Sequence, residues 1–268
     1  LNVLVKQTDY RGILKYSLLW GIIYHLVVVF WLSTNIGTNS TIAFISMLAA
    51  VFILCANTVI ISSLWFLIKN KFKYNLIIFS MIWVSVEYLR SYGLLGFPWV
   101  ALANTQTDYL YLIQNAQYVG IYGISFWVLL VNVFLFNLKN YDYKNKQLYI
   151  SLFVLILPWI TGYKLFEKYN HQPDDEGLSA LLIQPNINLY DKRDFSSKEQ
   201  TLDKIINMTR KNLLDDTQLI IWPESAMPFH RMQNLRDRKY LINRLFKKDN
   251  SYLLSGNIFY EGKNIYNS

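Results

Sequence analysis

The hydrophobic pattern divides the chain into two parts of different character. Between residues 1 and 167, long apolar runs alternate with short polar stretches, and the runs 41–68 and 116–138 contain no charged residue. A run of about 20 apolar residues can cross the hydrocarbon core of a bilayer as a helix. Five such segments in 167 residues would leave a water-soluble protein almost no polar surface. The pattern therefore predicts a membrane domain with five spans, at about 12–32, 42–68, 75–92, 119–138 and 147–163.

From residue 168 to residue 268 the pattern changes to short β-type runs that alternate with amphipathic stretches. Strands are predicted at 178–187, 218–222 and 252–260, helices at 196–214 and 234–248, and a turn at 261–264 leads into a fourth strand. This alternation is typical of an α/β layer. The polar stretch 171–177 has the composition of a linker between the two domains. A sheet that ends inside its fourth strand indicates an incomplete domain.

The loops between the apolar segments give the predicted membrane domain an orientation. Lysine and arginine occur before the first segment, between the second and third, and between the fourth and fifth, whereas loops 33–41 and 93–118 contain neither. Positive charge concentrates on the cytoplasmic side of membrane proteins. The chain is therefore predicted to start in the cytoplasm, and the domain 168–268 to lie outside it, on the periplasmic side of a bacterial inner membrane.

Composition narrows the classes of function. The net charge of +8 comes from 26 basic and 18 acidic residues in a chain that is 53% hydrophobic and only 16% charged. Residues 1–167 contribute +6 of this charge, so the basic excess is a topology signal and nucleic acid is not an expected partner. One cysteine excludes an internal disulfide framework, and three scattered histidines give no metal site. No phosphate-binding loop or other cofactor motif is present, and we expect neither metal nor cofactor.

The sharpest local feature is the segment Trp222–Pro228, which reads WPESAMP. It places Glu224 directly after a buried strand and between two prolines. Functional groups in open α/β sheets collect at the carboxyl ends of strands. A carboxylate there can act as a general base, although position alone favours a capping or loop glutamate.

The same segment closely resembles the W-P-E-[ST]-A-x-P signature of apolipoprotein N-acyltransferases, which are membrane enzymes with a nitrilase-like (carbon–nitrogen hydrolase) domain. Four further stretches match that family in the expected order. They are EYLR at 87–90 with GFPW at 96–99, VGIYG at 119–123, QPNI at 184–187 and YNS at 266–268. The resemblance covers nearly the whole chain. It implies a multi-pass α-helical membrane domain followed by the first part of an α/β nitrilase-like domain, an αββα sandwich.

The resemblance also implies an activity. A Glu–Lys–Cys triad takes an acyl chain from a phospholipid onto the cysteine as a thioester and passes it to the α-amino group of a diacylglyceryl-modified apolipoprotein. Glu224 matches the triad glutamate, whereas the lysine and cysteine would follow Ser268. The family also has two spans before the five predicted here and one after its soluble domain. We therefore expect a fragment truncated at both ends that is inactive alone.

A second group of candidates belongs to the predicted membrane mouth. Glu87 and Arg90 are spaced i, i+3 near the outer end of the third segment, and ionisable residues at membrane depth are functional candidates. A self-satisfying ion pair at the interface is the equal alternative. A substrate-binding or mouth role is assigned to both and to five neighbours of the two motifs: Phe97, Pro98, Trp99, Trp222 and Ser225. Trp99 and the tyrosines of its loop also fit an aromatic belt at the membrane surface.

Two other functions fit parts of the sequence. One is a membrane-tethered nitrilase-type amidase, and the other is a non-enzymatic membrane receptor or transporter subunit. The EYLR and GFPW elements favour the acyltransferase over the amidase, because a tethered hydrolase needs no specialised membrane mouth. The Trp222–Pro228 segment favours either enzyme over the receptor.

Overall fold

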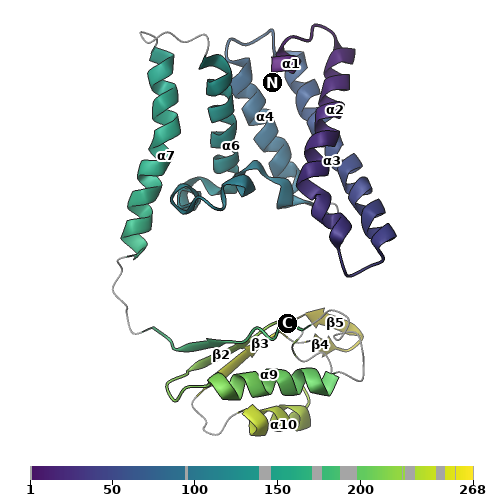
Figure 1. Ribbon diagram of the computed structural model, residues 1–268, viewed down its shortest axis with the longest axis vertical. Helices are drawn as coiled ribbons and strands as arrows, with labels where there is room; N and C mark the ends of the chain where they lie inside the picture. The colour runs from purple at the N-terminus through teal and green to yellow at the C-terminus, as the bar shows by residue number, and fades with distance from the viewer. Residues whose placement is uncertain are drawn as a thin grey trace. The chain divides into compact units, whose positions relative to one another are not determined.

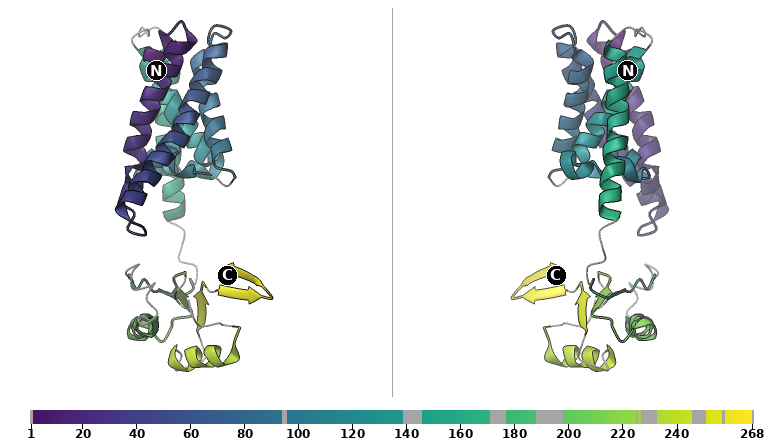
Figure 2. Two further views of the ribbon diagram at one scale, coloured as in Figure 1. Left: turned by 90° about the vertical axis from the view of Figure 1, so that its right-hand side faces the viewer. Right: turned by 90° about the vertical axis from the view of Figure 1, so that its left-hand side faces the viewer.

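The computed structural model describes residues 2–93, 96–138, 146–170, 177–187, 198–224, 226, 233–245, 251–256 and 258–267 (Figures 1 and 2). The chain forms two compact units, Leu1–Gln172 and Pro173–Ser268. The first unit is helical and the second contains all the strands of the described residues.

The helical unit is built mainly from helices aligned roughly along one direction (Figure 1). Among the described residues, four helices are long and apolar enough to cross a membrane: Tyr10–Thr34, Ser40–Ile68, Ala116–Asn137 and Leu148–Asn170. The third predicted span, 75–92, forms α4, which has only 16 residues and is about 24 Å long, against a hydrocarbon core of about 30 Å. Four of the five predicted spans are therefore long enough to cross a membrane, and the crossing by α4 stays a prediction. The elements are α1 (Asn2–Val5), α2 (Tyr10–Val29), η1 (Phe30–Thr34), α3 (Ser40–Ile68), α4 (Asn75–Arg90), η2 (Pro98–Val100), η3 (Leu102–Gln106), α5 (Leu110–Ile113), α6 (Ala116–Asn137) and α7 (Lys146–Asn170).

Small residues allow α2 and α3 to pack closely. The buried residues of α2 recur every four positions and include Ser17, Gly21 and His25. A Cβ atom on Gly21 would collide with Oγ1 of Thr58 on α3. That hydroxyl donates to the carbonyl oxygens of Cys55 at 2.8 Å and Ser17 at 3.3 Å. Close backbone approach and interhelical hydrogen bonds of this kind hold helices together in lipid, where the burial of apolar side chains contributes little to helix association.

Pro158 lies inside α7 without ending the helix. Proline has no N–H, so the carbonyl group of Val154, four residues earlier, loses its helical partner. The indole Nε1 of Trp127 on α6 donates to that oxygen at 2.8 Å. Side chains from neighbouring elements thus satisfy the backbone groups that proline frees, as membrane helices require. The helix continues to Asn170, beyond the predicted end at residue 163.

The segment between α4 and α6 folds back into the helical unit. In Figure 1 it lies beside the helices, short of the far ends of α2 and α3. Asn115, just before α6, donates to the carbonyl oxygen of Pro158 at 2.7 Å and accepts from Oγ1 of Thr161 at 2.6 Å. Gly162 lets the backbone of Tyr111 in α5 approach α7, since a Cβ atom there would overlap the Tyr111 carbonyl group. These contacts hold α5 to α7.

The second unit contains a parallel three-stranded sheet. Its strands lie in the order β1 (Ala180–Leu182), β2 (Leu219–Trp222) and β3 (Tyr252–Ser255), and Leu181, Ile220 and Leu253 lie side by side in register. Helices α9 (Lys198–Asn212) and α10 (Leu235–Leu245) connect the strands. Because right-handed crossovers that advance in one direction leave both helices on one face, α9 and α10 cover the same side of the sheet (Figure 1). The apolar core of this unit lies between the sheet and these two helices.

A separate hairpin follows the sheet. The predicted third strand, 252–260, is divided into β3 and β4 (Ile258–Glu261), and β4 pairs antiparallel with β5 (Asn264–Asn267). β3 ends at Ser255, directly before Gly256, and the apolar pattern alone did not predict this end. Gly262, at φ 60°, forms the hairpin turn that the sequence predicted.

Candidate functional site

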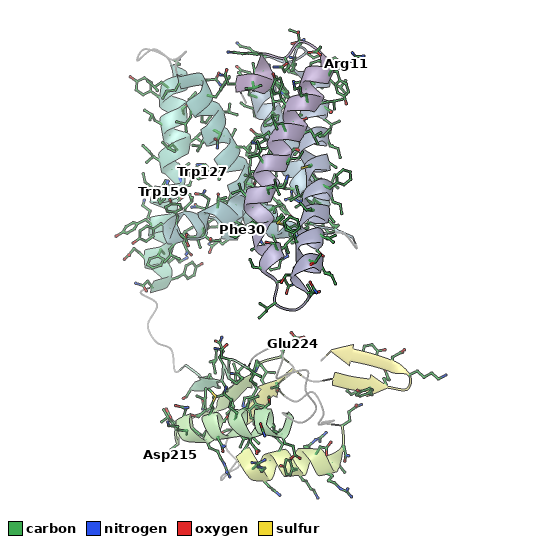
Figure 3. All side chains as sticks on the ribbon, turned by 45° about the vertical axis from the view of Figure 1, so that its right-hand side comes forward. Arg11, Phe30, Trp127, Trp159, Asp215 and Glu224 are labelled. Atoms are coloured by element: carbon green, nitrogen blue, oxygen red, sulfur yellow. The ribbon has the colours of Figure 1, made fainter. Side chains whose placement is uncertain are left out.

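The two candidate sites lie in different units. Glu224, the predicted general base, directly follows β2 in the second unit, where Pro223 stops the strand. The backbone turns there, and the N–H of Ala226 donates to the Pro223 carbonyl oxygen at 3.3 Å. The carboxylate is exposed at the margin of the unit, on the side away from α10 (Figure 3). A carboxylate in this position is available to take a proton from a group brought to the sheet edge.

Glu224 lines a cavity of about 200 Å³ at the carboxyl ends of β1 and β2. Since the strands are parallel neighbours, the loop that follows β1 meets the turn that follows β2. Asn186 in that loop has φ 45°, a left-handed conformation that asparagine tolerates better than most residues. The walls are Gln184, Pro185, Asn186, Ile187, Ile205, Pro223, Glu224 and Ala226. The QPNI segment quoted for the resemblance is thus brought to the predicted base.

The third strand also contributes to this edge. Gly256 directly follows β3, and a Cβ atom there would lie 3.1 Å from Cα and 3.4 Å from Cγ of Glu224. A side chain would push against the backbone of the predicted base. Sequence reasoning missed Gly256, although a glycine directly after a buried strand is a usable signal for close backbone approach.

Of the two remaining candidates in this motif, the structure describes Trp222 but not Ser225. Trp222 is 3% exposed and belongs to the core of the second unit, and its Nε1 donates to Oγ1 of the buried Thr209 at 2.9 Å. Its side chain therefore packs beneath the cavity and is not part of its wall. Ser225 lies outside the described residues.

Glu87 is buried in the helical unit, at 2% exposure. Its Oε1 accepts hydrogen bonds from Nε1 of Trp83 at 2.9 Å and from the backbone N–H of Leu102 at 3.0 Å. The carboxylate therefore ties α4 to η3. Within the described residues Glu87 and Arg90 form no ion pair, so the interface pair considered from the sequence is not what the structure contains.

Arg90 ends α4 and lines a separate cavity of about 540 Å³ together with Phe97. The N–H of Phe97 donates to the Arg90 carbonyl oxygen at 3.0 Å, which holds the following loop against the helix end. Phe97 is half-buried against the cluster that includes Val29 and Val51. These two mouth candidates are thus brought together.

Pro98 and Trp99 are exposed. Pro98 begins η2, where its missing N–H costs nothing, and Trp99 is 69% exposed. The Trp99 carbonyl oxygen accepts from Nδ2 of Asn104 at 2.8 Å. An exposed indole on the helical unit fits either the aromatic belt or a lipid contact.

No group of three or more histidine, cysteine, aspartate or glutamate side chains suited to a metal occurs among the described residues. Cys55 is 2% exposed and packs in the helical unit, as expected for an apolar packing residue.

Comparisons with known proteins point to one family. A family model described as the apolipoprotein N-acyltransferase N-terminal domain matches residues 1–134. The apolipoprotein N-acyltransferase of Geobacter metallireducens is 35% identical over 164 residues, which are 58% of this chain and 31% of that protein. That of Chlorobaculum tepidum is 24% identical over 88% of this chain and 44% of its own length. That of Wigglesworthia glossinidia brevipalpis is 27% identical over 100% of this chain and 54% of its own length. The chain spans about a third to a half of the length of these curated relatives.

Proposed function

The chain belongs to the apolipoprotein N-acyltransferase family, whose N-terminal domain model matches half of it, and from this premise we propose a role in lipoprotein N-acylation. The whole protein transfers an acyl chain from a phospholipid to the α-amino group of a diacylglyceryl-modified apolipoprotein. The observation that carries the proposal is the position of Glu224 on the wall of a cavity at the carboxyl ends of β1 and β2, with Gly256 at the end of β3 packed against it.

The proposed reaction has two steps. In the first, Glu224 takes the proton of a cysteine thiol, the thiolate attacks an ester carbonyl of the phospholipid, and the lysophospholipid leaves with that proton on its hydroxyl group as the thioester forms. In the second, the amine of the apolipoprotein attacks the thioester, an amide forms, and the thiol is restored. A lysine beside the site would stabilise the oxyanion of each tetrahedral intermediate.

The 268 residues contain one cysteine, Cys55, buried in α3 of the other unit. It is a packing residue, and the nucleophile is a different cysteine that this sequence does not contain. A polypeptide of these 268 residues alone should therefore transfer no acyl chain. Acyl transfer by that polypeptide without a complementing fragment would contradict this part of the proposal.

The nitrilase-like, αββα architecture of the second unit is part of the proposal. Parallel sheets are normally covered on both faces. The face opposite α9 and α10 carries exposed apolar side chains, with Leu182 at 71%, Leu254 at 59% and Tyr252 at 79% exposure. A second sheet packed against this face would complete a sandwich, which supports the proposed fold.

The proposed location is the inner membrane of a bacterium, with the second unit in the periplasm. Support comes from the lysines that follow α3 and those that precede α7, against loops at the other helix ends that contain no Lys or Arg. Membrane lipid supplies the acyl donor, and no nucleic acid is involved.

The test uses a complete protein that contains this chain. It is incubated with a phospholipid that carries a labelled acyl chain, and thioester-linked label on the protein is measured. Glu224→Gln should lower the rate of labelling at least about a hundredfold, the lower range for a lost general base. Glu199→Gln, at an exposed position in the first turn of α9, is the matched control and should label normally.

Two results would argue against the proposal. Labelling of Glu224→Gln at the rate of Glu199→Gln would remove Glu224 from the mechanism. Release of free fatty acid or ammonia from small amides, with no transfer to an apolipoprotein amine, would favour the nitrilase-type amidase instead.

A further inference from the structure

With α4 placed across the membrane as the sequence predicts, Arg90 lies close to one membrane surface. α4 begins at Asn75, just after the loop that contains Lys69, Lys71 and Lys73, and its 16 residues extend about 24 Å. Arg90 at its last position is therefore about 6 Å short of crossing a hydrocarbon core of about 30 Å. At that depth an arginine reaches the glycerol and phosphate region of the leaflet opposite the lysine-rich loop.

A cavity of about 540 Å³ opens beside Arg90, between α3 and the loop that follows α4. Three side chains with polar groups, Arg90, Asn57 and Tyr92, line a wall that is otherwise mostly apolar. Asn57 is half-buried in the uncharged helix α3. Apolar walls are supplied by Ile53, Leu54 and Phe97. An apolar pocket with a few convergent polar groups is the usual form of a small-molecule site.

Arg90 forms no ion pair within the described residues, although the charge of Glu87, one turn earlier, acts on it through space. Glu87 is the nearest acidic residue on α4, but its Oε1 is used by Trp83 and Leu102, and its Oε2 makes no hydrogen bond. The Nε and Nη2 atoms of Arg90 are buried and also make none. An arginine kept at membrane depth without a partner is costly, and such residues mark binding sites by default.

We propose that this cavity binds the phosphodiester group of a membrane phospholipid. The guanidinium group of Arg90 would bind the phosphate through charge-assisted hydrogen bonds, and the Asn57 amide would donate to a phosphate or ester oxygen. The apolar walls would contact the start of an acyl chain. The site belongs to the helical unit alone, and it rests on the proposed function only for the use made of the bound lipid.

The test measures lipid retention by the 268-residue chain, with no catalytic step. The chain is purified in detergent and titrated with dioleoylphosphatidylglycerol, and bound lipid is counted by native mass spectrometry. Arg90→Gln should weaken binding about 10- to 100-fold, the range for a lost hydrogen bond to a charged group. Arg11→Gln is the matched control, since Arg11 is an exposed arginine at the start of α2, and it should bind as the unchanged chain does.

Further arms identify the ligand and protect against misfolding. Dioleoylglycerol, which lacks phosphate, should be retained at least tenfold less well, and millimolar inorganic phosphate should not displace the bound lipid. If Arg90→Gln does not fold, as judged by circular dichroism, Asn57→Leu tests the same cavity and should reduce retention in the same direction. Equal retention by Arg90→Gln and Arg11→Gln, by dioleoylglycerol, or by a folded Asn57→Leu would overturn the proposal, and displacement by inorganic phosphate would make it a free-anion site.

These outcomes separate this site from the activity. Loss of lipid retention with Arg90→Gln would support the site even if Glu224→Gln labelled normally. Unchanged retention would remove the site and leave the role of Glu224 untouched.

Discussion

The two units place polar side chains in opposite ways. Of the ten buried polar residues in the described part of the chain, eight, among them Ser17, Thr58 and Ser125, belong to the helical unit, whereas Thr209 and Thr217 belong to the second unit. The helical unit turns large apolar residues outward, and its helices meet through small residues and hydrogen bonds. The second unit instead buries an apolar core between its sheet and two helices. The difference follows from the surroundings, since apolar burial stabilises contacts in water but adds little between helices in lipid.

The largest expected effect tests close backbone approach in the helical unit. Gly162→Leu places a side chain where the Tyr111 carbonyl group lies, so α5 and α7 can no longer pack as they do. We expect loss of the folded helical unit in detergent, measured as a fall in monodisperse protein and in the melting temperature. The control Ile160→Leu, at a position that is 50% exposed on the same helix, should change neither. A normal melting temperature for Gly162→Leu would mean that packing here does not depend on a small residue.

The next effect tests the apolar core of the second unit. Trp222→Ala removes a buried ring and its hydrogen bond to Thr209, which should cost about 3–5 kcal/mol of unfolding free energy. Hydrogen exchange of the 268-residue chain should show faster exchange in β2 and α9, with unchanged rates in α2 and α3. Equal acceleration in both units would contradict the division of the chain into two units.

A smaller effect tests hydrogen bonding in the helical unit. Trp127→Phe keeps an aromatic ring but leaves the Val154 carbonyl group without the donor that replaces the missing Pro158 N–H. Interhelical hydrogen bonds in membranes average about 0.6 kcal/mol, so we expect a loss of about 0.5–1.5 kcal/mol. In the double variant Trp127→Phe with Pro158→Ala the helix N–H returns, and the loss from Trp127→Phe should shrink. A loss that stays the same would show that the hydrogen bond does not compensate for the proline.

The smallest effect concerns the surface of the second unit. Nη1 of Arg244 lies 2.6 Å from Oδ1 of Asp203, and this carboxylate raises the pKa of Arg244 above its ordinary value. Arginine stays protonated at any working pH, so the raised pKa adds no pH dependence. Arg244→Gln should cost less than about 1 kcal/mol because the pair is partly exposed. Urea unfolding followed by exchange in α10 checks this, and a loss above 2 kcal/mol would mean that the pair matters for docking α10.

Much of the helical unit could be predicted because each helix is a long apolar run. The end of α7 could not be predicted from the sequence, because Pro158 suggests a break in the helix. The hydrogen bond from Trp127 on α6 to the Val154 carbonyl group explains why the helix continues beyond Pro158. Residues 93–118 were also predicted as one loop, whereas Pro98–Val100, Leu102–Gln106 and Leu110–Ile113 form short helices, and contacts of Asn115 and Gly162 hold α5 to α7. Such contacts join residues more than 40 positions apart and leave no periodic signal.

At the candidate site, the carboxyl end of β2 and its Glu224 were predictable from an apolar run that a proline ends. The residues that surround Glu224 could not be predicted, because the order of the strands in the sheet decides which loops lie next to each other. Asn186 and Gly256 reach the site through the parallel pairing of β1 and β3 with β2. Trp222 was assigned a substrate-binding or mouth role because it belongs to the motif, but its side chain packs in the apolar core of the second unit.

The short length of α4 has a mechanical consequence for the bilayer. Its neighbour α3 has 29 residues and is about 43 Å long, so lipids beside the two helices meet two different hydrophobic thicknesses. A bilayer adapts to such mismatch by thinning or tilting, at a cost of fractions of a kcal/mol per Å. With α4 across the bilayer as predicted, we expect lipids at that step to be displaced from their usual packing. The free energy needed to draw one of them out of the leaflet should then be lower at the end of α4 than in the surrounding membrane.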